Sequence, residues 1–391
     1  MRPGSGTLIM PSKNYAVITP IIPSKYHAGG QRTLDVYKII RSLNKDCRIT
    51  LLVINSHANY RYPDYDYLYE VFDQVFFLDK SFKKSISEYN LDRMIFDIID
   101  LHYSYSGKYI SYCRKLWPLS TIILTVMESS IRTMTLFMKS NWSKLFYPWK
   151  FFIACILDAV KEVIYLQLPD KVISISEADK STIDSYIIRK KVISAKLLTC
   201  VHSKNENYEL IEYEKNTIVY FAYFKSRSNL QALLWFVNKV HPQILKKIPG
   251  YKFKVVGYGI DEKLKIKLNK LQGVSILGEV DNNLDALNKS AVGITPAING
   301  AGMRGKIHIY ALAGLPSVAS QLAVEGLKYK HENSILVATS SLEFYQACVK
   351  LLTDSELATK LATNAKEICL NEYAWDSKIN IVKDIYEVQE I

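Results

Sequence analysis

The segment from Gly293 to Leu327 constrains the fold of this chain more than any other stretch. Its apolar start at 293–296 predicts a buried strand, and a glycine-rich turn leads from there into a helix from Met303 to Gly314. A second short strand is predicted at 317–320. This order of strand, turn, helix and strand is typical of a parallel α/β sheet, whose ligands bind at the carboxyl edge.

The turn in this segment has the chemistry of an anion site. Arg304 and Lys306 stand in the first turn of the predicted helix, where positive charge opposes the helix dipole unless a bound anion compensates. Glycine N–H groups and the N-terminus of a helix are also suited to contact a phosphate. We therefore predict a phosphate-binding turn; the alternative is a unit whose glycines serve only tight packing.

Length and periodicity predict two α/β domains. A chain of 391 residues exceeds one ordinary core, and a charged, non-periodic stretch at 200–216 is the predicted linker. We expect one domain over 15–205, a second over 217–375, and a helix in 376–391 that packs back toward the first domain. The predicted strands are 15–22, 48–54, 71–78, 94–101, 121–126 and 171–176 in the first domain and, besides the two above, 217–222, 251–256 and 274–277 in the second.

The chain is expected to act in the cytosol. Residues 1–14 contain no apolar run of signal-peptide length and are predicted to be an unstructured or added lead. The six cysteines are scattered without metal-ligand spacing, which predicts reduced thiols.

Polar residues at three predicted strand ends are candidates for acceptor binding and catalysis. Gly29, Gly30 and Arg32 fall in a loop before a helix at 33–43, although a pair of glycines is also typical of a plain turn. His102 and Glu128 follow the fourth and fifth strands, where a general base could act on a ligand. For each of the two, a structural hydrogen bond is the alternative, and Arg132 is the expected partner of Glu128 in that case.

A basic, aromatic region predicts contact with a membrane surface. The net charge is +12, and residues 101–150 hold seven basic side chains against the single acid Glu128. Within this region Trp142, Lys144, Trp149 and Lys150 are the predicted contacts with an anionic bilayer. The alternative is an interdomain helix with a solvated basic face. Nucleic acid is a weaker option because no binding motif accompanies the charge.

Residues 217–389 resemble the C-terminal domain of GT-B glycosyltransferases, closest to family 4, and the N-terminal half is similar in outline. The resemblance implies two Rossmann-like α/β domains facing a central cleft, and a nucleotide-sugar donor. The matching segments are Ala232–Phe236 with Asn229, Val256–Gly259, Gly278–Val280, Gly300–Ile307, Ala313–Pro316, Glu325–Leu327 and Tyr373–Asp376.

Carried over to this chain, the resemblance implies roles in donor binding for particular residues. The base and ribose would lie against Gly257, Gly259, Gly278 and Val280, and the diphosphate against Lys225, Gly302, Met303, Arg304 and Lys306. Cations and helix N–H groups would stabilise the departing diphosphate without a metal or other cofactor.

Three positions depart from the family pattern. Ala301 and Ile309 stand where two glutamates are usual, so His308, Tyr310 or the backbone would have to contact the ribose. Ala222 replaces a customary glycine, which makes close approach of a phosphate there less favourable.

We expect a retaining transferase that moves a sugar to a lipid-linked or polysaccharide acceptor in cell-surface glycan biosynthesis, peripheral on the cytosolic membrane face. The alternatives are a non-catalytic GT-B scaffold, favoured by the missing glutamates, and a sugar-nucleotide epimerase of the same fold.

Overall fold

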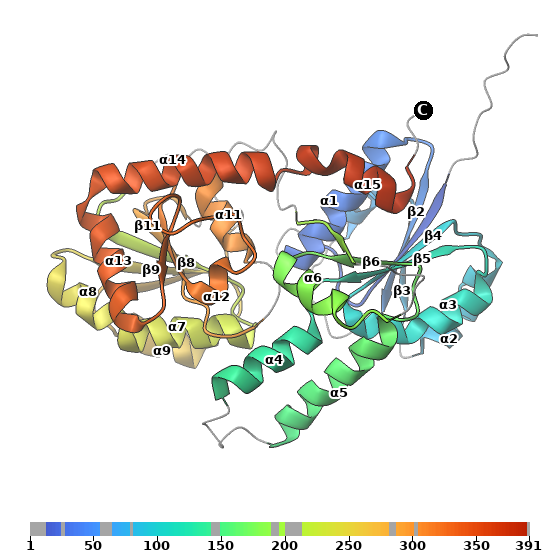
Figure 1. Cartoon of the computed structure of the whole chain (residues 1–391), viewed down its shortest axis with the longest axis horizontal. Helices are drawn as coiled ribbons and strands as arrows, with labels where there is room; N and C mark the ends of the chain where they lie inside the picture. The colour runs from blue at the N-terminus through green and yellow to red at the C-terminus, as the bar shows by residue number, and fades with distance from the viewer. Residues whose placement is uncertain are drawn as a thin grey trace, which may run out of the picture.

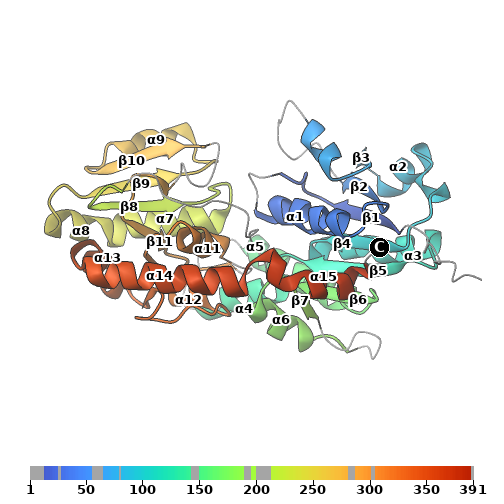
Figure 2. The same cartoon turned by 90° about the horizontal axis from the view of Figure 1, so that it is seen from above.

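The computed structural model describes residues 13–24, 28–54, 65–78, 81–141, 149–188, 195–199, 213–280, 287–300 and 304–388. Two α/β domains lie side by side; a long helix near the C-terminus runs along the C-terminal domain, and the chain then continues onto the N-terminal domain (Figure 1). Seen from above, each domain is a sheet with helices packed against it (Figure 2).

The N-terminal sheet has seven parallel strands in the order β3-β2-β1-β4-β5-β6-β7. Its strands are continuous apolar runs, as expected when helices cover both faces. The strands are β1 (Asn14–Thr19), β2 (Arg48–Ile54), β3 (Gln74–Leu78), β4 (Ile98–His102), β5 (Thr121–Val126), β6 (Lys171–Ser174) and β7 (Lys196–Leu197). The helices are α1 (Ala28–Leu43), α2 (Phe82–Glu88), α3 (Ile110–Leu116), α4 (Ser130–Asn141), α5 (Trp149–Tyr165) and α6 (Glu177–Asp184).

The C-terminal sheet has six parallel strands in the order β10-β9-β8-β11-β12-β13. These are β8 (Thr217–Phe221), β9 (Lys252–Val256), β10 (Val274–Gly278), β11 (Val292–Thr295), β12 (Ser317–Ser320) and β13 (Leu336–Ala338). The helices are α7 (Arg227–Lys239), α8 (His241–Lys247), α9 (Glu262–Asn269), α11 (Gly305–Leu312), α12 (Gln321–Val324), α13 (Ser341–Thr353) and α14 (Ser355–Glu372).

Both sheets reverse their strand order next to the first strand of the domain. The N-terminal sheet switches between β1 and β4, and the C-terminal sheet switches between β8 and β11. Ligands of doubly wound sheets bind at such a switch point, outside the carboxyl ends of the strands. The strand order therefore directs attention to the loops after β4 and β5 in one domain and after β8 and β11 in the other.

The end of the chain belongs to the N-terminal domain. After α14 a 3-10 turn (Trp375–Lys378) leads into α15 (Ile379–Tyr386), which packs against α1 (Figure 1). The hydroxyl of Tyr386 donates to the buried carboxylate of Asp100 at 2.7 Å, and its carbonyl accepts from the hydroxyl of Tyr15 at 3.2 Å. The chain therefore crosses between the domains twice.

Several predicted boundaries differ from the structure. The helix predicted at 33–43 begins at Ala28, so Gly29, Gly30 and Arg32 lie inside α1 rather than in a loop. Close packing explains the glycine at position 30, because a Cβ there would lie 2.6 Å from the amide nitrogen of Ser24. Strands β3 and β4 are shorter than predicted, since they begin only at Gln74 and Ile98 and the residues before them do not join the sheet.

The starts of three further helices are defined by particular residues. Ser176 caps α6, and its hydroxyl accepts from the amide of Asp179. The N-cap of α7 is Ser226. The α11 helix begins at Gly305, two residues later than predicted. Of the predicted lead 1–14, residues 1–12 lie outside the described part, and Asn14 opens β1.

Helices α4 and α5 form an antiparallel pair that projects from the N-terminal domain (Figure 1). The buried Glu162 of α5 joins them, because its carboxylate accepts from the amide of Ile131 at the start of α4 at 2.8 Å. Among the described residues, no helix is both long enough and apolar enough to cross a bilayer.

Candidate functional site

The carboxyl edges of the two sheets meet where the domains touch. Arg132, in the first turn of α4, forms an ion pair with Glu325 of the C-terminal domain. Gly326 has a φ of +75°, and a Cβ there would lie 3.0 Å from the amide nitrogen of Ala178. A larger residue would therefore disturb this contact between the domains.

Arg304 holds the turn after β11 in shape. Its guanidinium donates to the carbonyl of Gly300 at 2.6 Å and to that of Asn299 at 3.1 Å. Burial lowers the pKa of Arg304, while the nearby Glu128 carboxylate of the other domain acts in the opposite direction. Arg304 thus organises the turn and places a positive charge opposite the N-terminal domain.

Lys306 is a partly buried amine held by a neutral partner. Its Nζ donates to Oδ1 of Asn229 at 3.2 Å and lies 5.7 Å from the ring centroid of Tyr220. The Asn229 side chain is itself oriented, since its amide donates to the carbonyl of Tyr223 at 2.9 Å. Burial and the neighbouring Arg304 lower the pKa of Lys306 to about 7.

Arg304, Lys306 and Asn229 together form what we call the anion socket. The first turn of α11 contains no acidic residue, and Lys306 forms no ion pair with any described residue. Two cations at a helix N-terminus favour a bound anion, and the Glu128 carboxylate also acts on the charge of Arg304. Gly302 and Met303, also predicted to contact the donor, lie outside the described residues.

The glycines predicted to contact the base and ribose occupy two kinds of structural environment. A Cβ at Gly257 would lie 1.8 Å from the carbonyl oxygen of Ala222, and one at Gly259 would lie 2.6 Å from the amide nitrogen of Lys225. These two glycines are therefore required where the loops after β8 and β9 pack backbone against backbone. Gly278 has a φ of +78° and faces open space, so it leaves room for a ligand. Val280 follows it and is partly buried.

The two side chains predicted to replace the missing ribose contact are both used in the core. His308 is fully buried, its Nδ1 lies 2.9 Å from the hydroxyl of Tyr329, and its ring centroid lies 4.1 Å from that of Tyr373. The hydroxyl of Tyr310 donates to the carbonyl of Ile294 at 3.0 Å. Both lie on the buried face of α11, so the donor contact predicted for His308 has no support in this geometry.

His102 lies in a buried polar network. Its Nε2 is 3.0 Å from Oδ2 of Asp100, and its Nδ1 is 3.0 Å from the hydroxyl of Thr33. Asp100 also accepts from Thr125 and from Tyr386. Burial alone would raise the pKa of Asp100, but these contacts lower it. The network ties β4 to α1 and α15, which favours a structural role for His102.

Glu128 is the candidate base whose charge acts across the domain boundary. It is exposed, two residues beyond the end of β5, and its charge acts on Arg304 of the other domain. The expected partner of Glu128, Arg132, has ion pairs with Glu325 and with the buried Asp179 at 3.6 Å. The structure thus brings Glu128 and the anion socket together.

Tyr103 is a candidate site residue that no sequence pattern identified. Its φ of 67° and ψ of 139° are strained for a residue with a side chain, and it immediately follows β4. Its hydroxyl is enclosed and has no hydrogen-bond partner among the described residues. Burial raises its pKa, and nearby Tyr105 and Glu128 add to the effect. Strain of this kind is concentrated at functional sites.

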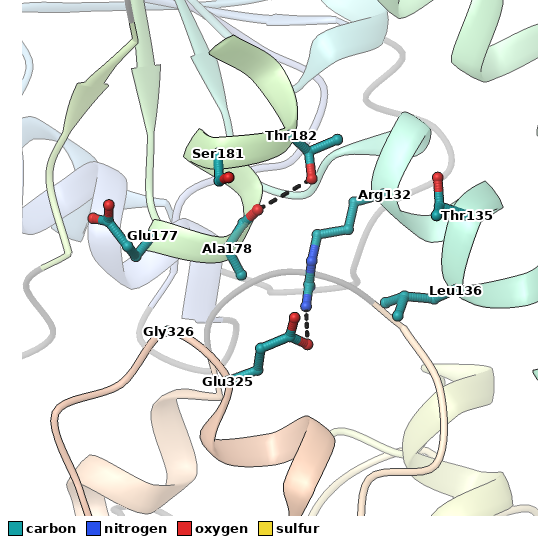
Figure 3. Close-up of a pocket in the computed structure, with 9 residues that line it drawn as sticks. All are labelled: Arg132, Thr135, Leu136, Glu177, Ala178, Ser181, Thr182, Glu325 and Gly326. Atoms are coloured by element: carbon teal, nitrogen blue, oxygen red, sulfur yellow. Dashed lines mark hydrogen bonds and ion pairs between the residues drawn. The ribbon is translucent and has the colours of Figure 1, made fainter. Parts of the chain in front are cut away.

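A pocket of about 350 Å³ lies between the two domains (Figure 3). Its walls are the first two turns of α4 and α6 and the loop after α12, and Arg132 extends across it toward Glu325. We call it the interdomain pocket; its lining residues are Arg132, Thr135, Leu136, Glu177, Ala178, Ser181, Thr182, Glu325 and Gly326.

The predicted acceptor residues belong to α1, and the side chains predicted to contact a membrane fall outside the described residues. Arg32 is buried, with its guanidinium 5.2 Å from the ring centroid of Trp375, so it links α1 to the C-terminal crossing. Trp142 and Lys144 lie outside the described residues. Trp149 and Lys150 open α5, and their side chains lie outside the described part as well.

Two doubly wound domains whose carboxyl edges meet at a cleft define the GT-B fold, as solved structures confirm. Sucrose-phosphate synthase from Thermosynechococcus elongatus superimposes with a TM-score of 0.69 at 13% identity, covering 96% of this chain and 98% of that one. HepE of Anabaena, solved with UDP-glucose, gives a TM-score of 0.70 at 12% identity over 96% of this chain and 100% of its own. At these identities the likeness shows the fold.

Sequence comparison adds the class of the C-terminal domain. Residues 215–354 match the family model described as glycosyl transferases group 1. An uncharacterised 44.6 kDa protein in a cps region of Klebsiella pneumoniae is 26% identical over 176 residues, which is 43% of each chain. The alignment thus spans less than half of that relative. The predicted resemblance to GT-B glycosyltransferases is confirmed.

Proposed function

We propose that this protein is a glycosyltransferase that moves a sugar from a nucleotide-sugar donor to a lipid-linked or polysaccharide acceptor in cell-surface glycan biosynthesis. The observation that carries the proposal is the anion socket. Arg304 and Lys306 stand at the carboxyl edge of a sheet, at the N-terminus of α11 and within the segment that matches the family model. A departing nucleoside diphosphate supplies the anion that this arrangement favours.

In the proposed reaction the cations of the chain stabilise the leaving group without a metal ion. The bond between the anomeric carbon and the diphosphate oxygen breaks, and a bond forms between that carbon and an acceptor oxygen. In a retaining reaction the acceptor proton passes to the departing diphosphate, and Glu128 orients the acceptor hydroxyl. An inverting reaction requires a side-chain base, and Glu128 is better placed for it than the buried His102.

The acceptor is assigned to a membrane surface for two reasons. The outer face of α5 exposes Ile153, Leu157, Val160 and Ile164, which follow one another at helical spacing. This apolar stripe continues the segment predicted to contact an anionic bilayer and lies on the projecting helix pair (Figure 1). The cps region of the Klebsiella pneumoniae relative agrees with a capsule or polysaccharide product.

A non-catalytic GT-B protein is the second candidate, and one observation favours it. Ile309 stands where the family has a glutamate, and neither His308 nor Tyr310 presents its side chain in place of it. A protein that binds nucleotide but lacks a firm ribose contact could serve as a partner rather than an enzyme.

A panel of nucleotide sugars distinguishes the two candidates. We expect the full chain to release nucleoside diphosphate from at least one donor, faster when membrane lipid acceptors are present. Lys306→Ala and Arg304→Ala should each reduce diphosphate binding by about 1.5 to 3 kcal/mol, because each removes a charge-assisted contact. Binding without release would support the non-catalytic candidate, and unchanged binding by both variants would exclude the anion socket.

Turnover also tests the role of Glu128. Glu128→Gln keeps the shape of the side chain and removes its charge. A loss on the order of 10²- to 10⁴-fold is expected of a general base, whereas a positioning role predicts a smaller loss. Parent-like turnover with a defined acceptor would exclude both roles.

A further inference from the structure

A second pocket, of about 460 Å³, lies at the amino edge of the N-terminal sheet, away from the carboxyl edge that meets the other domain. Strands β1, β2 and β3 begin at this pocket, and the segment before β4 completes its wall. Since β2 is seven residues long, about 20 Å of sheet separates the pocket from the carboxyl edge. We call it the amino-edge pocket; its lining residues are Asn14, Arg48, Thr50, Asp73, Gln74, Arg93, Met94, Ile95 and Phe96.

The strand residues of the amino-edge pocket share one face of the sheet. Asn14 stands beside Arg48 in the parallel register, and Thr50 stands beside Gln74. Arg48 and Thr50 are two positions apart on β2, so their side chains point to the same side. Thr50 is buried, whereas Arg48 and Gln74 are exposed. The sheet itself therefore places polar side chains from the wall to the mouth of the pocket.

Two arginines in the lining have no acidic partner. Neither Arg48 nor Arg93 forms an ion pair or a side-chain hydrogen bond with any described residue. The one carboxylate of the lining, Asp73, is engaged by Arg41 of α1 at 2.6 Å and accepts from the amide of Ile49 at 2.7 Å. Burial would raise the pKa of Asp73, but these contacts lower it. Two uncompensated guanidinium groups therefore line one cavity.

The other half of the same edge has its positive charge compensated. Lys13 immediately precedes β1, and Lys171 opens β6. Both pair with the carboxylate of Glu387, at 2.7 Å and 3.0 Å, just after the end of α15. The chain thus neutralises the cations on one side of the edge and leaves those of the amino-edge pocket available. A concave site lined by charge of one sign concentrates ligands of the opposite sign.

The charge of the two arginines suits a phosphate monoester. Guanidinium groups bind phosphate and carboxylate in a bidentate manner. A phosphate monoester carries a charge of about −1.5 to −2 near pH 7, which matches two guanidinium groups more closely than the single charge of a carboxylate does. The ligand of this pocket is therefore expected to carry a phosphate.

The remaining side chains of the pocket suit a body rich in hydroxyl groups. The side chains of Asn14, Thr50 and Gln74 form no hydrogen bond with another residue in the part of the chain that the structure describes. Amides and hydroxyls can both donate to and accept from sugar hydroxyls. Ile95, which is 77% exposed, adds apolar surface for the C–H face of a ring. The volume is in the range of small-ligand pockets.

We propose that the amino-edge pocket binds a sugar phosphate, at a second ligand site that is separate from the anion socket. Arg48 and Arg93 hold the phosphate, while Asn14, Thr50 and Gln74 contact the hydroxyl groups of the sugar. A ligand bound here does not compete for space with one at the carboxyl edge. The inference does not depend on the proposed function, because the N-terminal domain alone provides the pocket.

Calorimetric titration of the full chain tests the pocket without turnover. The probes are glucose 6-phosphate, glucose 1-phosphate, fructose 6-phosphate and mannose 6-phosphate, compared with inorganic phosphate. We expect at least one sugar phosphate to bind, about tenfold or more tightly than inorganic phosphate does. Arg48→Gln and Arg93→Gln should each weaken its binding by about tenfold or more, because each removes a charge-assisted contact. Both arginines are exposed, so these changes leave the core intact.

Two variants control for net charge and for the sugar contact. Lys45→Gln removes one positive charge from the exposed turn before β2, outside the pocket lining, and should keep the parent affinity. Thr50→Val removes a hydroxyl and nearly keeps the shape of the side chain. It should weaken binding of the sugar phosphate and leave the affinity for inorganic phosphate unchanged.

Lys306→Ala distinguishes the amino-edge pocket from the anion socket, which also attracts phosphate. We expect this variant to bind the sugar phosphate like the parent. Binding that is lost in Lys306→Ala but kept in both arginine variants places the ligand in the anion socket and overturns the proposal. So does the absence of binding by the parent, an equal affinity for inorganic phosphate, or an equal loss in Lys45→Gln and the arginine variants.

Discussion

At the scale of single residues, the properties of the anion socket depend on where its charged side chains lie rather than on how many there are. Lys306 is partly buried, has the neutral partner Asn229 and lies beside Arg304. This environment disfavours the charged amine and leaves it sensitive to any anion that arrives. Both consequences are measurable.

The affinity for nucleoside diphosphate should fall as pH rises through about 7, the lowered pKa of Lys306. The protonated amine is the form that binds the anion, so above this pH binding must take up a proton. The free energy of unfolding should show the opposite trend, rising between about 7 and the ordinary lysine pKa of about 10.4, because the unfolded chain binds the proton more strongly there. Calorimetry with UDP in buffers of different ionisation enthalpy measures the proton uptake.

Lys306→Arg is the control for this pH dependence, because a guanidinium stays charged throughout the range. The phosphate of UDP titrates in both proteins alike. Equal pH dependence in the parent and in Lys306→Arg would show that Lys306 does not carry the effect.

Asn229→Asp should weaken diphosphate binding by about tenfold or more, because an aspartate would pair with Lys306 and occupy its charge. Stability should fall somewhat, since the new carboxylate cannot donate to the carbonyl of Tyr223 as the Asn229 amide does. The matched control is Asn238→Asp, an exposed position on the same helix α7. Calorimetric titration with UDP gives both affinities; an equal loss in the two variants would indicate a general charge effect.

At the scale of elements, the pair of helices α4 and α5 combines a buried anchor with an exposed apolar face. Glu162 accepts from the backbone at the start of α4, so α5 holds the N-terminus of the helix that carries Arg132. The opposite face of α5 leaves Leu157 and Val160 about half exposed, at 51% and 53%. A helix with this distribution is suited to lie on a surface.

Replacing Leu157 and Val160 together by serine should weaken binding to vesicles that contain phosphatidylserine, because less apolar area is removed from water on docking. Vesicle flotation measures the bound fraction. Leu119→Ser is the control, since this leucine is 98% exposed but lies in the turn before β5. Parent-like binding by the double variant would exclude the apolar face of α5 as the contact.

Element boundaries show what the sequence could predict. Strands β2 and β5 match their predicted ranges, because their apolar runs are bounded by polar residues. Strands β7 and β13 were missed, since two or three residues carry no periodic signal. The helix α1 begins five residues early because the glycines that suggested a loop serve close packing instead.

The sequence predicted those parts of the candidate site that a local pattern encodes, but not the parts that depend on packing. The positions of Arg304 and Lys306 could be predicted because they follow a glycine-rich turn at the start of a helix. The directions of His102 and His308 depend on which face of an element is buried, and the backbone of Tyr103 depends on its surroundings. The pair of Arg132 and Glu325 joins residues 193 positions apart, which no single-sequence pattern reveals.

At the scale of the whole molecule, α15 links the two domains, because it follows the C-terminal domain in sequence but packs in the core of the N-terminal domain. The core of the N-terminal domain includes Val382, Ile385 and Tyr386 beside residues of β1 and α1. Removing the contacts of α15 should therefore destabilise the N-terminal domain, although α15 stands at the other end of the chain.

Tyr386→Phe should lower the free energy of unfolding by about 1 to 3 kcal/mol, because the buried carboxylate of Asp100 loses a hydrogen-bond donor. Urea denaturation followed by circular dichroism measures the change. Tyr345→Phe on α13 is the control, since its hydroxyl forms no hydrogen bond with a described residue. Equal stability of the parent and Tyr386→Phe would show that the contact contributes nothing to folding.

The place of α15 also has a consequence for how the protein is made. Translation delivers β1 first, yet Tyr386 leaves the ribosome 286 residues after Asp100, the carboxylate to which it donates. Domains usually fold as units in the order of their synthesis. Here the domain that is made first stays incomplete until the second domain has emerged, so the C-terminal domain is complete before the N-terminal domain that precedes it.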